Sequence, residues 1–70
     1  MHQQIVLDST GDARHRFDPE DVNEVAAARR RYEGFIARGY YAFDKKDGRR
    51  LDRFDTSVED TLFVPRLKGG

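Results

Sequence analysis

Residues 18–39 read DPEDVNEVAAARRRYEGFIARG, and they carry the clearest helical pattern in the chain. Asp18 is suited to accept hydrogen bonds from the free N–H groups of a first turn, and Pro19 suits the first helical position. Gly39 favours the left-handed conformation that ends many helices. The sequence therefore predicts a long helix from Pro19 to Arg38. Its buried side should carry the apolar residues at helical spacing, which are Val22, Val25, Tyr32, Phe35 and Ile36.

The residues before the helix predict a β-hairpin. Residues 3–8, QQIVLD, are short and rich in β-branched side chains, which is typical of a strand. Residues 13–17 alternate so that His15 and Phe17 share one face. A cluster of turn-forming residues joins the two segments, and we expect Gly11 to adopt a positive φ there.

Three more strands are predicted after the helix. Residues 40–44 form an aromatic strand, and an Asp-Gly turn leads from it to a weaker strand at residues 50–54. Residues 61–64, TLFV, are apolar on both faces, which indicates a strand in the middle of the sheet. Pro65 should end that strand because it has no N–H to donate.

The predicted order, β-β-α-β-β-β, defines an α+β fold. A helix of about 20 residues spans ~30 Å and can lie across one face of a small mixed sheet of four or five strands. The crossover through the helix allows the first and last strands to pair in parallel. This is the outline of a single β-grasp domain over residues 1–65. A ferredoxin-like fold would need a second long helix, which the sequence does not offer.

Length and composition narrow the function classes. With 70 residues and 8.1 kDa, the chain is one small domain with little room for an enclosed active site, so we expect no enzyme. The 13 basic and 13 acidic residues balance, which argues against a nucleic-acid partner. Absence of cysteine excludes disulfides, thiolate zinc sites and cysteine nucleophiles. Without an apolar run of ~20 residues or a signal-peptide pattern, we expect a cytoplasmic protein with no membrane contact.

The C-terminal tail, residues 66–70, carries a specific resemblance. It reads Arg66-Leu67-Lys68-Gly69-Gly70, which is similar to the basic, leucine-containing tail of ubiquitin. Residues 62–70, LFVPRLKGG, also look like the ends of prokaryotic sulfur carriers. The chain therefore resembles the ubiquitin-like β-grasp family, and a prokaryotic member better than the eukaryotic set. The likeness concerns the whole outline, but at residue level only the last nine positions or so.

The resemblance implies a modifier whose Gly70 carboxylate is activated by an adenylating enzyme and then joined to an amine of a target protein. Gly69 and Gly70 lack side chains, so they can pass through a narrow channel of that enzyme. Tail recognition would fall to Arg66, Leu67 and Lys68. A conjugating enzyme and a deconjugating peptidase are further expected partners, and the chain itself needs no cofactor.

Two alternatives remain open at this point. The chain can be a sulfur carrier that forms a thiocarboxylate at Gly70, or a small phage- or plasmid-type interaction protein whose Gly-Gly end is incidental. If it is a modifier, the internal amines able to accept a second copy are those of Lys45, Lys46 and Lys68.

Other notable residues are expected to be structural. His15 should be a partly buried, hydrogen-bonded histidine, and no metal site is predicted. Arg29, Arg30 and Arg31 should pair with acidic neighbours on a solvated helix face. A solvated turn is expected for the carboxylates of Asp52, Asp55, Glu59 and Asp60, and packing for Tyr40, Tyr41 and Phe43. No exposed aliphatic patch like that of ubiquitin can be identified, because most aliphatic side chains are needed inside.

Overall fold

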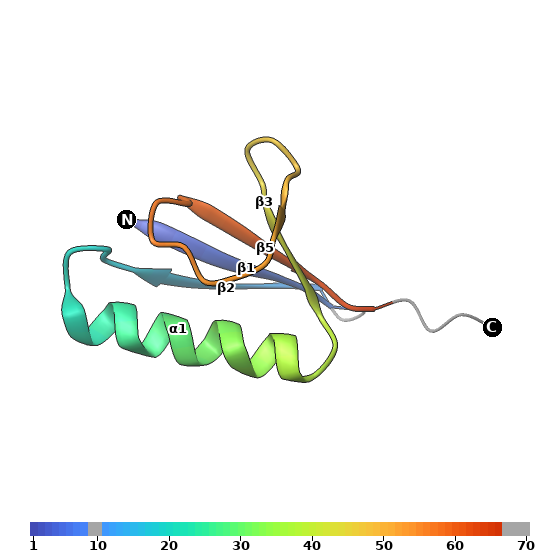
Figure 1. Ribbon diagram of the computed structural model, residues 1–70, viewed down its shortest axis with the longest axis horizontal. Coiled ribbons are helices and arrows are strands. Elements are labelled where there is room, and N and C mark those ends of the chain that lie inside the picture. The colour runs from blue at the N-terminus through green and yellow to red at the C-terminus, as the bar shows by residue number, and fades with distance from the viewer. Residues whose placement is uncertain (9–10, 67–70) are drawn as a thin grey trace.

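A computed structural model of the chain describes residues 1–8 and 11–66. These residues form one helix and one five-stranded mixed sheet, so the predicted α+β class is confirmed (Figure 1). The elements, in chain order, are β1 (His2–Asp8), β2 (Gly11–Phe17), α1 (Val22–Ala37), β3 (Tyr41–Asp44), β4 (Arg50–Leu51) and β5 (Asp60–Val64). The helix is too short and too polar to cross a membrane.

The sheet places the first and last strands side by side. Its strand order is β2-β1-β5-β3-β4, and β5 is therefore the central strand, as predicted. β1 and β5 run parallel, with Gln3 beside Asp60 and Val6 beside Phe63. The other neighbouring strands are antiparallel. β2 ends beside the start of β1, and α1 carries the chain from there to the opposite end of the sheet. β3 then brings the chain back to the end where β5 starts, so that β5 runs parallel to β1.

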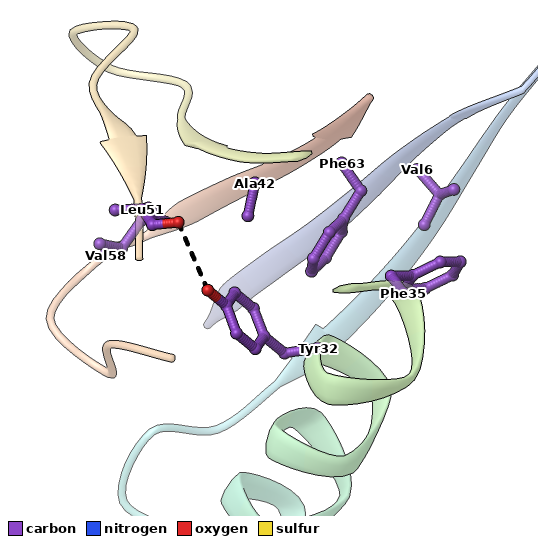
Figure 2. Close-up of a cluster of buried hydrophobic side chains, with 7 residues drawn as sticks. All are labelled: Val6, Tyr32, Phe35, Ala42, Leu51, Val58 and Phe63. Carbon is purple, nitrogen blue, oxygen red and sulfur yellow. Dashed lines mark hydrogen bonds between the residues drawn. The ribbon is translucent and has the colours of Figure 1, made fainter. Parts of the chain in front are cut away.

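The hydrophobic core lies between α1 and one face of the sheet. Phe63 is fully buried, and its ring centroid lies 5.0 Å from that of Phe35 and 5.8 Å from that of Tyr32. Figure 2 shows Phe63 pointing from β5 toward α1, between these two helical rings. The Tyr32 hydroxyl donates a long hydrogen bond of 3.5 Å to the carbonyl of Leu51. This contact connects the helix to the short strand β4.

The start of the helix differs from the prediction. α1 begins at Val22, not at Pro19, and its N-cap is Asp21. The Asp21 carboxylate accepts hydrogen bonds from two backbone N–H groups of the first turn, at 2.9 and 3.2 Å. Asp18, the predicted cap, closes a separate turn by accepting from the N–H of Glu20 at 2.9 Å. Both aspartates precede the apolar pattern of the helix, so either could be its N-cap. Residues 19–20, which were predicted to lie in the first helical turn, belong instead to the turn at Asp18.

The end of the helix matches the prediction. Gly39 has a φ of +91°. Its N–H donates to the carbonyl of Ile36 at 3.0 Å, and the N–H of Tyr40 donates to that of Phe35 at 3.0 Å. This is the Schellman arrangement, in which a hydrophobic contact usually joins the two outer residues. Here the rings of Phe35 and Tyr40 lie 5.1 Å apart. Gly11, predicted to adopt a positive φ, has a φ of +128°.

The buried stripe of the helix is narrower than predicted. Ala28, Tyr32 and Phe35 are buried, whereas Val22 is 78% exposed and Ile36 is 40% exposed. At ~100° per residue, Val22 lies ~120° and Ile36 ~80° around the helix axis from Ala28. Both therefore fall beyond the surface that the sheet covers, so the prediction that they are core residues was wrong.

The segment after β4 supplies core side chains without forming a strand. The predicted strand at residues 50–54 is reduced to Arg50–Leu51. The Phe54 ring packs back from the following loop, 5.9 Å from the ring of Tyr32. Val58, in a stretch read as a polar turn, is only 3% exposed. Since Leu51 and Phe54 are three positions apart, a loop lets both reach the core where a regular strand would not.

Candidate functional site

The sheet has a second face that no helix covers in the part of the chain that the structure describes. Strand alternation places the side chains of Leu62 and Val64 on this face, because Phe63 between them points into the core. Tyr41 lies beside Val64, and Phe43 beside Leu62. We call Tyr41, Phe43, Leu62 and Val64 the open face. All four side chains are partly exposed.

The open face corrects two expectations. Tyr40 packs against the core as expected, but Tyr41 and Phe43 do not, because neighbouring strand residues point to opposite sides. An apolar surface that includes aliphatic side chains is present, although the sequence had indicated none. The sequence contained the information needed to predict this surface. Residues 61–64 are apolar on both faces, and a single helix covers only one face of a sheet.

Tyr41 carries an arginine pair at the point where the chain leaves β5. The guanidinium carbon of Arg50 lies 4.5 Å from the Tyr41 ring centroid, and that of Arg66 lies 5.7 Å from it. Arg66 Nε also donates a long hydrogen bond of 3.4 Å to the Tyr41 hydroxyl. This bond and the charge of Arg66 lower the pKa of Tyr41 from its ordinary value, and the charge of Arg50 adds to the effect. The two arginines are held in place by an aromatic ring.

A pocket of about 210 Å³ adjoins this pair. Its apolar lining includes Tyr32, Ile36 and Leu51, and Arg50 and Arg66 contribute to its polar lining. Burial raises the pKa of the Tyr32 hydroxyl, which donates a hydrogen bond to the carbonyl of Leu51. The pocket thus has a mixed lining, in which apolar side chains lie next to cations that can bind a carboxylate or a phosphate.

The predicted tail is described only at its first residue. Arg66 follows Pro65 directly after β5 ends at Val64, and both Pro65 and Arg66 are exposed. The other residues assigned to recognition and activation lie outside the described residues; these are Leu67, Lys68, Gly69 and Gly70. Arg66 is the one predicted tail residue among the described residues.

The two described candidate acceptors, Lys45 and Lys46, lie at the other end of β5. Both are exposed in the loop between β3 and β4, and the N–H of Lys45 donates to the carbonyl of Asp60 at 3.0 Å. Both also line a wider pocket of about 470 Å³ that includes Glu59. Because β5 rises by ~3.3 Å per residue, these lysines lie ~13 Å or more along the strand from Val64. Lys68, the third candidate, lies outside the described residues.

His15 is partly buried on the side of β2 that faces the helix. Burial and the nearby charge of Arg31 lower the pKa of the imidazole. Among residues 1–8 and 11–66 the ring has no hydrogen-bond partner, so the predicted hydrogen bond is absent. No group of three or more potential metal ligands comes together within these ranges either.

The predicted ion pairs along the helix do not form. The one ion pair within the described part of the chain joins Arg49 to Asp44 at 3.8 Å. Arg29 lies over the ring of Phe54 at 5.2 Å, and Arg31 donates to the side-chain oxygen of Gln4 at 2.6 Å. These two arginines therefore contact residues of the neighbouring loop and strand instead of acidic residues of the helix. The guanidinium group is weakly hydrated and suits such aromatic and amide contacts.

The carboxylate turn is built by local hydrogen bonds. Asp55 accepts from the N–H of Ser57 at 2.9 Å and from its hydroxyl at 2.7 Å. These bonds lower the pKa of the Asp55 carboxyl. Asp52 and Glu59 are exposed, whereas Asp55 and Asp60 are partly buried. The Asp55 carboxylate therefore helps to form the turn.

Comparison with known proteins adds no assignment. No family model, no curated protein and no solved structure matches this chain. The tail sequence, the strand order and the arginine pair on Tyr41 are the features of this chain that bear on its function.

Proposed function

We propose that this chain is a ubiquitin-like protein modifier built on a β-grasp fold. The strand order β2-β1-β5-β3-β4, with β1 and β5 parallel at the centre and a helix on one face, supports this fold. The observation that carries the functional proposal is the Gly-Gly sequence that follows the central strand after a short polar segment. Pro65 and Arg66 are exposed, so the segment starts at the surface.

The proposed reaction takes place on partner enzymes. A Gly70 carboxylate oxygen attacks the α-phosphate of ATP on an activating enzyme, and pyrophosphate leaves. An amine of the target, or first a thiol of a partner, then attacks the acyl carbon of the adenylate. AMP leaves, and transfer to the amine yields an amide. Because this chain has no cysteine, any thioester forms on a partner residue.

The globular part contributes binding that is remote from the reacting carboxylate. Such binding energy positions the tail without any catalytic group on the modifier itself. The open face and the arginine pair on Tyr41 lie at the end of β5 from which the tail departs. They are the described surfaces best placed to contact an enzyme that holds the tail.

The test is to remove the terminal glycines and look for conjugates. A chain with an N-terminal affinity tag is expressed in the organism that encodes it and captured under denaturing conditions. The proposal predicts higher-mass conjugates for the intact chain and none after deletion of Gly69 and Gly70. Since trypsin cleaves after Lys68, mass spectrometry should find a diglycine remnant on acceptor lysines.

A matched control separates loss of chemistry from loss of fold. Gly34→Ala also alters a glycine, but a Cβ added there meets no atom within 4 Å, so conjugation should persist. If the intact chain gains sulfur in place of a carboxylate oxygen and forms no conjugates, the chain is a sulfur carrier and the modifier proposal is wrong. If neither conjugates nor a thiocarboxylate form, and the deletion of Gly69 and Gly70 leaves the effect of the chain in its organism unchanged, an interaction protein is favoured instead.

A further inference from the structure

Arg50 and Arg66 are cations without an acidic partner in the described part of the chain. Arg49, next to Arg50, does form an ion pair with Asp44. Arg50 and Arg66 instead stack on Tyr41. An arginine over a ring keeps N–H groups at the edge of its guanidinium plane available for hydrogen bonds. Arg66 commits its Nε–H to the Tyr41 hydroxyl and retains the N–H groups of its two terminal nitrogens. Both side chains are thus pre-organised to bind an anion from outside.

The adjoining pocket indicates what else the ligand carries. Apolar side chains of Tyr32, Ile36 and Leu51 form part of its lining, and Ile36 is 40% exposed at the surface of α1. A volume of about 210 Å³ suits one bulky apolar side chain rather than a cofactor-sized molecule, for which sites run to roughly 300–1,000 Å³. The ligand should therefore combine an apolar group with negative charge a few ångströms away.

We propose that the pocket beside Tyr41 binds an acidic peptide segment of a partner protein, with one bulky apolar side chain in the pocket and carboxylates on Arg50 and Arg66. This binding goes beyond the proposed modifier function, because it requires neither Gly69 nor Gly70. It gives the end of the sheet from which the tail departs a docking site of its own.

A peptide fits the site better than a nucleic acid does. Asp52 lines the same pocket and would repel any anion there, so the part of the ligand inside the pocket must be uncharged. A nucleic acid carries a charged phosphate at every residue, whereas a peptide can alternate acidic and apolar side chains. The chain has no net charge, whereas binding to nucleic acid normally draws on a wide basic surface. A peptide can direct its carboxylates to the two arginines and its apolar side chain past Asp52.

The experiment measures peptide binding by fluorescence anisotropy, with NMR to locate the site. The probe is a fluorescein-labelled synthetic peptide of Asp and Glu residues with one central Phe. Matched probes have Ala in place of Phe, or Lys in place of each acid, and a single-stranded RNA oligonucleotide serves as a third. We expect the acidic Phe peptide to bind and to shift the Nε–Hε signals of Arg50 and Arg66.

Variants then assign the contacts. Arg50→Ala and Arg66→Ala should each weaken binding about tenfold, the effect of losing one charge-assisted contact. Arg14→Ala is the control, because it removes the same charge from an exposed site on the edge strand β2, and it should leave binding within about twofold. Tyr41→Leu keeps every charge but removes the stacking ring, and should also weaken binding. Circular dichroism confirms the fold of each variant.

The outcomes keep the two proposals separate. Binding is measured with the intact chain and with the Gly69–Gly70 deletion, and both should bind equally. Equal losses from the three Arg→Ala variants would mean a general charge effect and would overturn this inference. Binding of RNA in preference to the acidic peptide, or no binding of the peptide, would also overturn it. None of these results depends on whether the deletion abolishes conjugation.

Discussion

The two faces of the sheet differ most clearly within β5 itself. Thr61 and Phe63 point toward α1 and are buried, whereas Leu62 and Val64 alternate with them and remain partly exposed. One apolar strand therefore supplies both the core and the open face. The difference shows that this small domain uses one side of its central strand to form the core and leaves the other side partly exposed.

The largest expected effect is that of Phe63→Ala. Phe63 is fully buried, and the cavity left by its ring should lower the free energy of unfolding by about 3–5 kcal/mol. Leu62→Ala, one residue away on the open face, should cost about 1 kcal/mol because its side chain is only partly buried. Urea denaturation measures both. Equal losses would show that the two faces contribute alike to stability.

A second neighbouring pair compares polar residues on the two faces. Gln4 is fully buried, donates to the carbonyl of Ala28 at 2.9 Å and accepts from Arg31. Gln4→Ala should cost about 2 kcal/mol, because two groups at the helix–sheet contact lose their partner. Gln3→Ala on the other face should change stability by less than about 0.5 kcal/mol, since the Gln3 side-chain oxygen has no partner to lose. Urea denaturation measures both losses. A larger loss of stability from Gln3→Ala than from Gln4→Ala would contradict the expected difference between the two faces.

The smallest expected effect concerns pH and His15. Burial and Arg31 lower its pKa from the ordinary 6.5, so the folded state favours the neutral ring. The resulting stability is fully present above pH 6.5 and is lost as the pH falls through the lowered folded-state pKa. In urea titrations at stepped pH, His15→Gln should remove this part of the pH dependence. Arg16→Gln, on the opposite face, should retain it, and identical profiles for all three chains would refute the assignment.

The sequence predicted the elements whose signals are local. Gly39 ended the helix as expected, and the apolar run at residues 61–64 predicted the central strand. The helix start was misplaced because Asp18 and Asp21 both have the side chain that a cap needs, and only the turn at Asp18 distinguishes them. The burial of Phe54 could not be predicted, because it lies in a loop and loops have no regular alternation of apolar and polar residues.

The candidate site depended on contacts that a linear pattern does not carry. Arg66 meets Tyr41 only because β3 and β5 pair with Tyr41 beside Val64. Arg50 reaches the same ring from β4, which the sequence had predicted to be longer. The tail chemistry was predicted from residues 62–70 and the outline of the fold, but the arginine pair and its pocket required the strand register.

The parallel pairing of β1 with β5 has a consequence for biosynthesis. Residues 60–64 leave the ribosome after every other element, so β1 and β3 cannot acquire their shared neighbour until then. Joining Gln3 to Asp60 closes a loop of ~55 residues, whose entropic cost and distant contacts slow folding. A nascent chain arrested before residue 60 would expose the unpaired edge of β1, a template for aggregation. Such fragments should depend on chaperones or be degraded.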